Sequence, residues 1–239
     1  MAILSLQGVS KRYGALTVTD GVSFDVPEGQ ALGIIGPNGA GKSTLFNLIT
    51  GNVSVDAGTV AFDGRDVTRD SARSRCLSGI GRSFQIPRMF AGLTVYENLA
   101  TAAAFGRDLP ERAVTSDCAD ILARTGLMRR ANDLAGRLSL LERKRLELAR
   151  AMATVPRLLL LDEIAGGLTE GECSSLVETI AAIHAAGTTI VWIEHVLHAL
   201  TAVVERIVVL DFGRVIADGA PAEVMERQEV RKVYLGIEI

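Results

Sequence analysis

The stretch Gly36-Pro37-Asn38-Gly39-Ala40-Gly41-Lys42-Ser43-Thr44 decides the fold of this chain. It fits the pattern G-x-x-x-x-G-K-[ST], and we call it the phosphate loop. The apolar run Ala31–Ile35 before it predicts a buried strand, and residues 43–50 predict a helix that Gly51 stops. A glycine-rich turn between a strand and a helix leaves backbone N–H groups unpaired and convergent, which favours an anion. The chain is therefore predicted to bind a nucleoside triphosphate.

Two side chains of the phosphate loop have predicted roles. Lys42 can place a point charge on the β- and γ-phosphates, and the hydroxyl of Ser43 can ligate Mg²⁺. The alternative is a chance glycine-rich turn. The strand before the loop, the helix after it and the Lys-Ser pair together argue against that alternative.

The composition is that of a compact protein. The 239 residues suit one large domain or two small ones, and a hydrophobic fraction of 48% can build a sizeable core. A net charge of −3 argues against a general nucleic-acid binder. The N-terminus lacks the pattern of a secretion signal, and no apolar run approaches the roughly 18 residues that cross a bilayer. We expect a cytoplasmic chain whose membrane role comes through partners.

A second element of the phosphate site follows four consecutive leucines, residues 158–161, which predict a strand buried on both faces. Asp162 and Glu163 come at its end, where carboxylates are costly unless they serve a cation or a reaction. Asp162 is placed to hold the Mg²⁺ shell and Glu163 to orient an attacking water. The alternative is an acidic pair that caps the next helix.

The chain has few other candidates for chemistry. The apolar run 188–193 predicts a buried strand that ends in Glu194 and His195, and the carboxyl end of a parallel strand lies on the ligand edge of a sheet. Taken alone, such a histidine is more often a surface or core residue. A zinc site with His198 lacks a third ligand, and three scattered cysteines form neither a zinc site nor a C-x-x-C pair.

The remaining pattern predicts an α/β fold in one domain, residues 1–239. Strands are expected around 4–9, 22–26, 59–62, 207–211 and 215–218, with turns at Asp63-Gly64 and residues 212–214. Helices are expected at 96–105, 113–125, 142–153 and 171–186, and after Pro221. A nucleotide-binding core, about 1–86 and 156–239, would carry an inserted helical subdomain, about 87–155.

These elements together resemble the ATP-binding cassette (ABC) family, the ATPase subunits of ABC transporters. The phosphate loop matches its Walker A motif, and Arg82-Ser83-Phe84-Gln85 resembles its Q-loop. Asp162 and Glu163 match the Walker B pair, and His195 matches the switch histidine. The resemblance implies a P-loop NTPase cassette with a mixed-sheet core, an antiparallel β subdomain and an inserted helical subdomain. The GTPase alternative needs an Asn-Lys-x-Asp motif, which the chain lacks.

The resemblance also implies roles for individual residues, with ATP and Mg²⁺ as the ligands. The catalytic residues would be Glu163, His195 and Gln85, and the groups at the metal would be Ser43, Gln85 and Asp162. Tyr13, in Lys11-Arg12-Tyr13-Gly14, looks like the aromatic residue that stacks on adenine. The ATP-binding set would be Tyr13, Gly36, Pro37, Asn38, Gly39, Ala40, Gly41, Lys42, Ser43 and Thr44.

A narrower resemblance is to the branched-chain amino acid importers. Residues 86–99, residues 230–236 and Ile193-Glu194-His195 are similar to that subfamily, and the Arg-x-Phe-Gln form resembles its LivG-type ATPase more than the LivF-type partner. The same tail occurs in the lipopolysaccharide-export ATPase, which is the main alternative. A cassette of DNA repair or translation, or a regulatory ATP-binding module, is another. Such cassettes usually carry a coiled-coil insertion or a second cassette.

The chain departs from the family where the family acts across a dimer. The signature normally reads Leu-Ser-Gly-Gly-Gln/Glu, whereas this chain has Leu138-Ser139-Leu140-Leu141-Glu142, the signature segment. Leu141 stands where the family brings a backbone N–H to the γ-phosphate held by the opposing subunit, a close approach that glycine suits. Ile164 replaces a proline, and Thr169 replaces the aspartate or asparagine of the D-loop.

The resemblance and its departures together predict the assembly. We expect a heterodimer with a second, LivF-like ABC ATPase subunit, because that partner would supply an intact signature. The alternative is that a shifted backbone still donates the needed hydrogen bond and leucine is tolerated, which leaves a homodimer open. Two transmembrane permease subunits and, indirectly, a periplasmic solute-binding protein would complete it, with no nucleic acid. The chain would be cytoplasmic and peripheral on the inner membrane. Residues 86–90 would receive a coupling helix of the permease, or alternatively pack as a loop edge on the helical subdomain.

Overall fold

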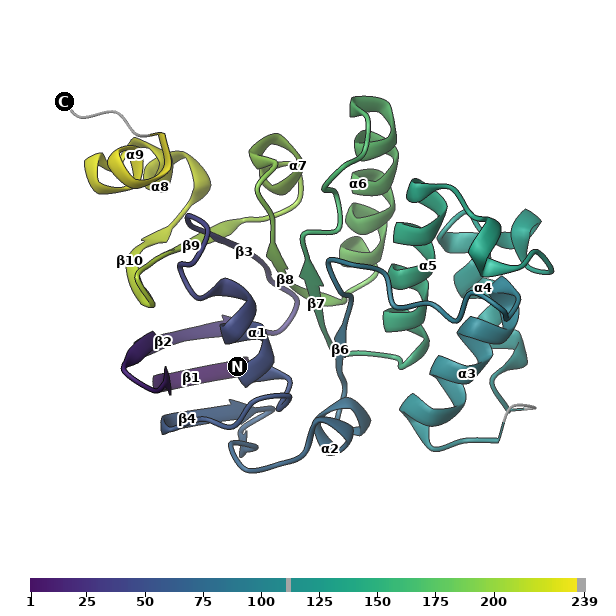
Figure 1. Cartoon of the computed structure of the whole chain (residues 1–239), viewed down its shortest axis with the longest axis horizontal. Coiled ribbons are helices and arrows are strands. Elements are labelled where there is room, and N and C mark those ends of the chain that lie inside the picture. Colours follow the sequence, from purple (N-terminus) through teal and green to yellow (C-terminus); the bar gives the residue numbers. More distant parts are fainter. Residues whose placement is uncertain (111–112, 236–239) are drawn as a thin grey trace.

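The computed structural model describes residues 1–110 and 113–235, and this part of the chain forms two sheets (Figure 1). The smaller sheet is antiparallel, has the order β2-β1-β4-β5 and consists of β1 (Ala2–Tyr13), β2 (Leu16–Pro27), β4 (Ala57–Phe62) and β5 (Arg65–Asp66). The larger sheet has the order β10-β9-β3-β8-β7-β6. Its strands are β3 (Ala31–Ile35), β6 (Ile80–Arg82), β7 (Leu158–Asp162), β8 (Thr189–Ile193), β9 (Arg206–Asp211) and β10 (Arg214–Gly219).

The larger sheet is mixed, as predicted. Strands β9, β3, β8, β7 and β6 run parallel, and β10 pairs with β9 in the antiparallel sense. The carboxyl ends of β3, β7 and β8 therefore meet at one edge, where the chain continues into the phosphate loop, Glu163 and Glu194 respectively. This edge is where an open α/β sheet binds its ligand.

Helix α1 (Lys42–Ile49) lies between the two sheets. Its apolar side chains join a cluster with inward residues of β1 and with one face of the larger sheet, including Leu158 and Leu160 of β7. The alternate residues Leu159 and Leu161 belong to the cluster on the opposite face, which α6 (Glu170–Ala185) and α7 (Leu197–Thr201) cover. The leucine run is thus buried on both faces, as predicted.

The helical subdomain lies beyond β6 and β7, at one end of the molecule (Figure 1). It contains α3 (Val95–Arg107), α4 (Thr115–Arg124) and α5 (Leu140–Ala153), which pack on one another. A capping box fixes the start of α3 at Thr94 and that of α5 at Ser139. The remaining α-helices of the described residues are α2 (Ala72–Leu77), α8 (Pro221–Glu226) and α9 (Gln228–Leu235), and two short 3-10 helices span Met128–Arg130 and Ala135–Arg137.

Most predicted elements are confirmed, and the differences have physical reasons. Strands β1 and β2 are longer than expected. Gly8 and Gly21 suggest strand ends in the sequence, but both have positive φ and lie where the β1–β2 register shifts, so each strand continues past its glycine. Strand β6 and helices α2 and α7 were not expected, since three to six residues are too few to show a period. In the tail 230–236, Gly236 lies outside the described residues.

Among residues 1–110 and 113–235, no helix has the length and apolar character that crossing a bilayer requires.

Candidate functional site

The phosphate loop wraps around the start of α1 and lines a cavity of about 190 Å³ with Val18 and Glu163. Gly41 precedes the helix with φ 98°. A Cβ at this position would lie 2.4 Å from the carbonyl oxygen of Val18, so only glycine fits. The loop therefore presents its backbone N–H groups and the helix N-terminus to one small cavity, an arrangement suited to phosphate.

The ammonium of Lys42 is buried beneath this loop. Its Nζ donates hydrogen bonds to the carbonyl oxygens of Gly36, at 2.7 Å, and Pro37, at 2.9 Å. Burial lowers the pKa of Lys42, an effect that the carboxylates of Glu163 and Asp162 oppose. The charge is thus held at the loop, where phosphate oxygens can replace the two carbonyls as its acceptors.

The backbone of Glu163 adopts a conformation that is rare for residues other than glycine. Its φ is 45°, in the left-handed region, and its N–H donates to the carbonyl oxygen of Ile193 at 2.8 Å. Such a conformation costs free energy and persists where the surrounding structure enforces it, most often at functional sites. Here it turns the chain sharply at the end of β7 and directs the carboxylate toward the phosphate-loop cavity.

The carboxylate of Glu163 joins the two other predicted catalytic residues. Nε2 of Gln85 donates to one of its oxygens, and Nε2 of His195 lies 3.0 Å from the other. The side chain of Glu163 is 17% exposed, so it is sheltered without being sealed off. The structure therefore brings Gln85, Glu163 and His195, from three separate strand ends, to one point beside Lys42.

Two residues that were given no role from the sequence contact the segments that carry Gln85, Glu163 and His195. Lys144 of α5 is buried, and its Nζ donates to the carbonyl oxygens of Gln85, at 2.9 Å, and Glu163, at 3.2 Å. Glu194 is also buried; its carboxylate accepts from the backbone N–H groups of Ala165 and His195, each at 3.0 Å. Apart from the contact between the neighbours Glu194 and His195, these hydrogen bonds join segments that are distant in the sequence and meet only in the folded chain.

The donors expected for Mg²⁺ fit that ion. Oδ1 of Asp162 is buried and has no hydrogen-bond partner among the described residues, so it can accept a cation or its water. Ser43 lies in the first turn of α1 and lines the same cavity as Glu163. Hydroxyl and carboxylate oxygens suit Mg²⁺, which keeps several waters and takes its other ligands from phosphates. When bound, the ion would neutralise charge on the phosphate oxygens.

Tyr13 ends β1 on the exposed rim of the smaller sheet, and its ring faces the ammonium of Lys11 at 5.5 Å. It does not line the phosphate-loop cavity. Its pairing partner Leu16 lines an adjacent cavity of about 480 Å³ together with Pro37 and other loop residues. Stacking of Tyr13 on an adenine base therefore stays a prediction.

The signature segment begins α5. Ser139 and Glu142 form its capping box, and Arg130 pairs with Glu142 at 2.8 Å, so these polar side chains are engaged within the helical subdomain. Leu140 is exposed, whereas Leu141 is partly buried against the core. Leucine side chains thus occupy the first turn of α5, beside backbone N–H groups that a helix start leaves without intrahelical partners.

Thr169, in the D-loop position, has a local structural role. It caps α6, where its side chain and backbone exchange hydrogen bonds with Glu172. An N-cap favours threonine as well as aspartate and asparagine, so the residue that replaces them keeps the helix start.

Residues 86–90 lie against α5 at the rim of a groove. Glu147 accepts from the N–H of Arg88 at 3.1 Å, and Arg150 donates to the carbonyl of Arg88 at 2.7 Å. Ile86 is 77% exposed and Phe90 50%, whereas Met89 packs on the core of the helical subdomain. A groove of about 350 Å³ runs beside this segment, and its lining includes Arg82, Phe84, Phe105 and Glu147.

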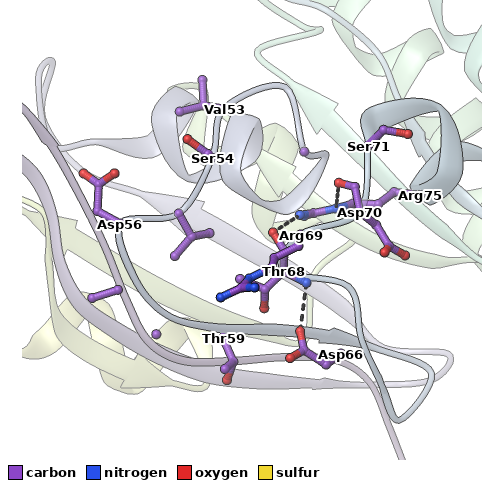
Figure 2. Close-up of a pocket in the computed structure, with 14 residues that line it drawn as sticks. Val53, Ser54, Asp56, Thr59, Asp66, Thr68, Arg69, Asp70, Ser71 and Arg75 are labelled. Atoms are coloured by element: carbon purple, nitrogen blue, oxygen red, sulfur yellow. Dashed lines mark hydrogen bonds between the residues drawn. The ribbon is translucent and has the colours of Figure 1, made fainter.

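A larger cavity, of about 750 Å³, lies at the other end of α1 (Figure 2). The guanidinium of Arg75 is buried beside it and donates to the carbonyls of Leu48 and Ile49, which end α1, and to those of Thr68 and Asp70. Arg75 thus holds the last turn of the helix whose first turn carries the phosphate loop.

The sequence matches a family model described as "ABC transporter" over residues 19–166. A second model, described as "Branched-chain amino acid ATP-binding cassette transporter", matches residues 214–238.

Individual proteins are similar over almost the whole chain. The high-affinity branched-chain amino acid transport ATP-binding protein BraF of Pseudomonas aeruginosa is 35% identical, over 98% of each chain. The lipopolysaccharide export system ATP-binding protein LptB of Haemophilus influenzae is 33% identical, over 99% of this chain and 98% of that protein. A crystal structure of the ADP conformation of an ATP-binding cassette of an ABC transporter has a TM-score of 0.90 and 30% identity, covering 99% of this chain and 100% of that one.

Proposed function

The chain belongs to the ABC transporter family, and we propose on that basis that it is the ATP-hydrolysing subunit of an importer of branched-chain or related amino acids. The observation that carries the ATPase role is the meeting of Gln85, Glu163 and His195 beside Lys42. A protein that only bound nucleotide would have no need to enforce the costly backbone of Glu163 at that point.

In the proposed reaction a water attacks the γ-phosphate in line with the leaving oxygen. Glu163 orients this water by accepting a hydrogen bond from it. His195 and Gln85 hold the carboxylate of Glu163 in place through its two oxygens. Lys42 and the N–H groups of the phosphate loop bind the phosphates, and Ser43 and Asp162 hold Mg²⁺. Such preorganised donors supply most of the stabilisation that phosphoryl transfer needs.

Amino acid import is favoured by the match of residues 214–238 to the branched-chain amino acid model. The similarity to the lipopolysaccharide-export protein over 99% of this chain keeps export of that lipid as the second candidate. An amino acid importer and a lipopolysaccharide exporter differ in the permease and in the solute, so an assay that distinguishes them must use the whole complex.

For coupling, we propose that the groove beside residues 86–90 receives a cytoplasmic helix of a permease subunit. Its lining combines aromatic rings with charged groups and includes Arg150, whose guanidinium lies 5.5 Å from the ring of Phe90. The side chains of Ile86 and Phe90 are exposed. The exposure of Ile86 and Phe90 supports docking for these two residues. The packing of Met89 on the core fits the alternative, in which the loop edge is closed. The chain would therefore work at the cytoplasmic face of the inner membrane.

For assembly, we propose a heterodimer with a second ATP-binding subunit. Leu140 and Leu141 occupy the segment that faces the partner's nucleotide in this family, whereas every group that acts on the chain's own nucleotide is present. An importer of this kind would also use a solute-binding protein outside the membrane.

The function is tested in proteoliposomes that contain this chain, its genomic neighbour permeases and the second ATPase. We expect ATP-dependent uptake of leucine or valine in the presence of the solute-binding protein, and none with Lys42→Ala. Hydrolysis that responds to lipopolysaccharide but not to any amino acid would support the second candidate instead. An absence of ATP hydrolysis by the assembled complex would contradict the ATPase role.

A further inference from the structure

Arg82 ends β6 and reaches across to the aspartate expected at the metal. Its Nη2 lies 2.7 Å from Oδ2 of Asp162, and the two side chains are 8% and 6% exposed. A buried ion pair of this kind is expensive to form, since both charges leave water. Its presence beside the phosphate loop calls for a reason other than stability.

The guanidinium is fixed from several directions. Nη1 donates to Oδ1 of Asn47 on α1 at 2.6 Å. The ring of Phe46, also on α1, lies 5.5 Å from the guanidinium carbon, and the ring of Phe84 lies 5.0 Å from it. Arg82 therefore joins the helix that follows the phosphate loop, the segment that leads to Gln85, and the end of β7.

These contacts decide how the carboxylate of Asp162 is used. Oδ2 is bound by Arg82, and the backbone N–H of Asp162 donates to Oγ of Ser83 at 3.3 Å. Oδ1 is the oxygen that stays buried without a partner among the described residues. Rotation that exchanged the two oxygens would have to break the contact of Oδ2 with Arg82, so the pair favours Oδ1 as the atom left for a cation or its water.

We propose that Arg82 is a positioning residue for Mg²⁺, which acts by holding Asp162 in the orientation that presents Oδ1 to the ion. The proposal rests on the proposed function, in which the site binds Mg²⁺ with ATP. A guanidinium also repels a cation, so two effects oppose each other. Groups that orient a metal ligand are typically worth about ten- to a hundredfold in metal affinity, and we expect orientation to be the larger of the two effects.

The test separates binding of the ion from binding of the nucleotide. Calorimetry with a non-hydrolysable ATP analogue gives the nucleotide affinity of the full-length protein in EDTA and across a Mg²⁺ series. We expect Arg82→Met to raise the Mg²⁺ concentration for half-maximal effect about ten- to a hundredfold. The affinity in EDTA should change less than twofold, because Arg82 does not line the phosphate-loop cavity.

Two comparisons make the result specific. Arg206→Met removes a similar pair, in which Arg206 binds both oxygens of Asp218 at 2.6 Å between β9 and β10, and should leave the Mg²⁺ dependence unchanged. In the double variant Arg82→Met, Asp162→Asn, the loss should be no greater than with Asp162→Asn alone, because Arg82 acts through that carboxylate. Fully additive losses would contradict this route.

Milder variants keep the test decisive if Arg82→Met does not fold. Asn47→Ala removes one anchor of the guanidinium, and Arg82→Lys keeps the charge with fewer bonds, so each should give an intermediate loss of Mg²⁺ affinity. Unchanged or tighter Mg²⁺ binding in these variants, with nucleotide affinity intact, would overturn the proposal. Failure of the wild-type protein to bind the analogue at all would instead refute the proposed function.

Discussion

Nε2 of His195 lies 3.0 Å from Oε1 of Glu163, although the two residues are 32 positions apart in the chain. The contact closes because β7 and β8 are neighbouring parallel strands whose carboxyl ends stop at the same level. A histidine that is ambiguous by itself thereby becomes part of the same constellation as the predicted catalytic carboxylate.

The first prediction concerns that carboxylate. Glu163→Gln should lower ATP turnover by the assembled complex at least about 100-fold, because an amide cannot accept the proton or orient the water as a carboxylate does. Nucleotide affinity should persist, so ATP-bound dimers should accumulate in size-exclusion chromatography. Glu178→Gln, an exposed position on α6, serves as the control and should turn over normally. Unchanged turnover in Glu163→Gln would remove Glu163 from the mechanism.

The second prediction separates the two nucleotide sites of the proposed heterodimer. Lys42→Ala should abolish turnover of the full complex, because this chain's site would meet the intact signature of its partner. The matching lysine variant of the partner should leave much of the turnover, since that site would face Leu140 and Leu141. The rates of both variant complexes are compared at saturating ATP. Equal losses, or brisk hydrolysis by this chain alone as a homodimer, would show that the sites are equivalent.

The third prediction concerns the groove. The double variant Ile86→Asp, Phe90→Asp should weaken assembly with the permease, because two exposed apolar side chains of the segment beside the groove become charged. Nucleotide affinity should stay within twofold, since neither residue lines the phosphate-loop cavity. Met128→Asp changes an exposed residue of the helical subdomain outside the groove and is the matched control. Co-purification at equal expression measures assembly, and a normal yield of complex would exclude docking at this edge.

A fourth prediction tests the support of α1. Arg75→Met leaves the carbonyls of Leu48 and Ile49 without their buried donor, which should lower the free energy of unfolding by about 3 kcal/mol. Arg73→Met removes a surface pair with Asp108 and should stay within about 0.5 kcal/mol of wild type. Urea unfolding followed by circular dichroism gives both values. Equal stabilities of the two variants would show that Arg75 does not support the helix.

The fifth prediction follows from burial of Glu147, which raises the pKa of its carboxyl above the ordinary 4.5. The folded protein then holds this proton more tightly than the unfolded chain, so stability from the group is present at low pH and is lost as pH rises through the raised pKa. Relative to Glu147→Gln, the wild-type free energy of unfolding should fall above pH 4.5, by at most about 1.4 kcal/mol per pH unit, and then level off. Urea unfolding from pH 4 to 8 measures the difference, and a constant difference would contradict the raised pKa.

Local chemistry made the core of the site predictable from the sequence. The phosphate loop needs glycine at fixed places, and a run of four leucines followed by two carboxylates favours a buried strand that ends at a ligand edge. The predicted strand Ala31–Ile35 and the helix after it therefore correspond to β3 and α1 within a residue.

Contacts between distant segments were not predictable in the same way. Lys144, Glu194 and Asn47 are ordinary polar positions in the sequence, and their importance comes from partners that the fold brings to them. Arg82 was visible as part of a motif, but its pair with Asp162 depends on the pairing of β6 with β7, and three residues are too few to reveal a strand. For Lys144, Glu194 and Arg82 the signal is the burial of a charged group, and it exists only after folding.

The two leucines of the signature segment also determine what glycine at these positions would cost the fold. Leu141 packs on the core, and Cδ2 of Leu140 lies 3.5 Å from the position that a Cβ of Gly167 would take. Glycine at both positions would remove this packing and place two poor helix formers in the first turn of α5. We therefore expect the usual signature of the family to fold less stably in this chain, so the close nucleotide approach that glycine suits and the packing of α5 make opposite demands on the same two positions.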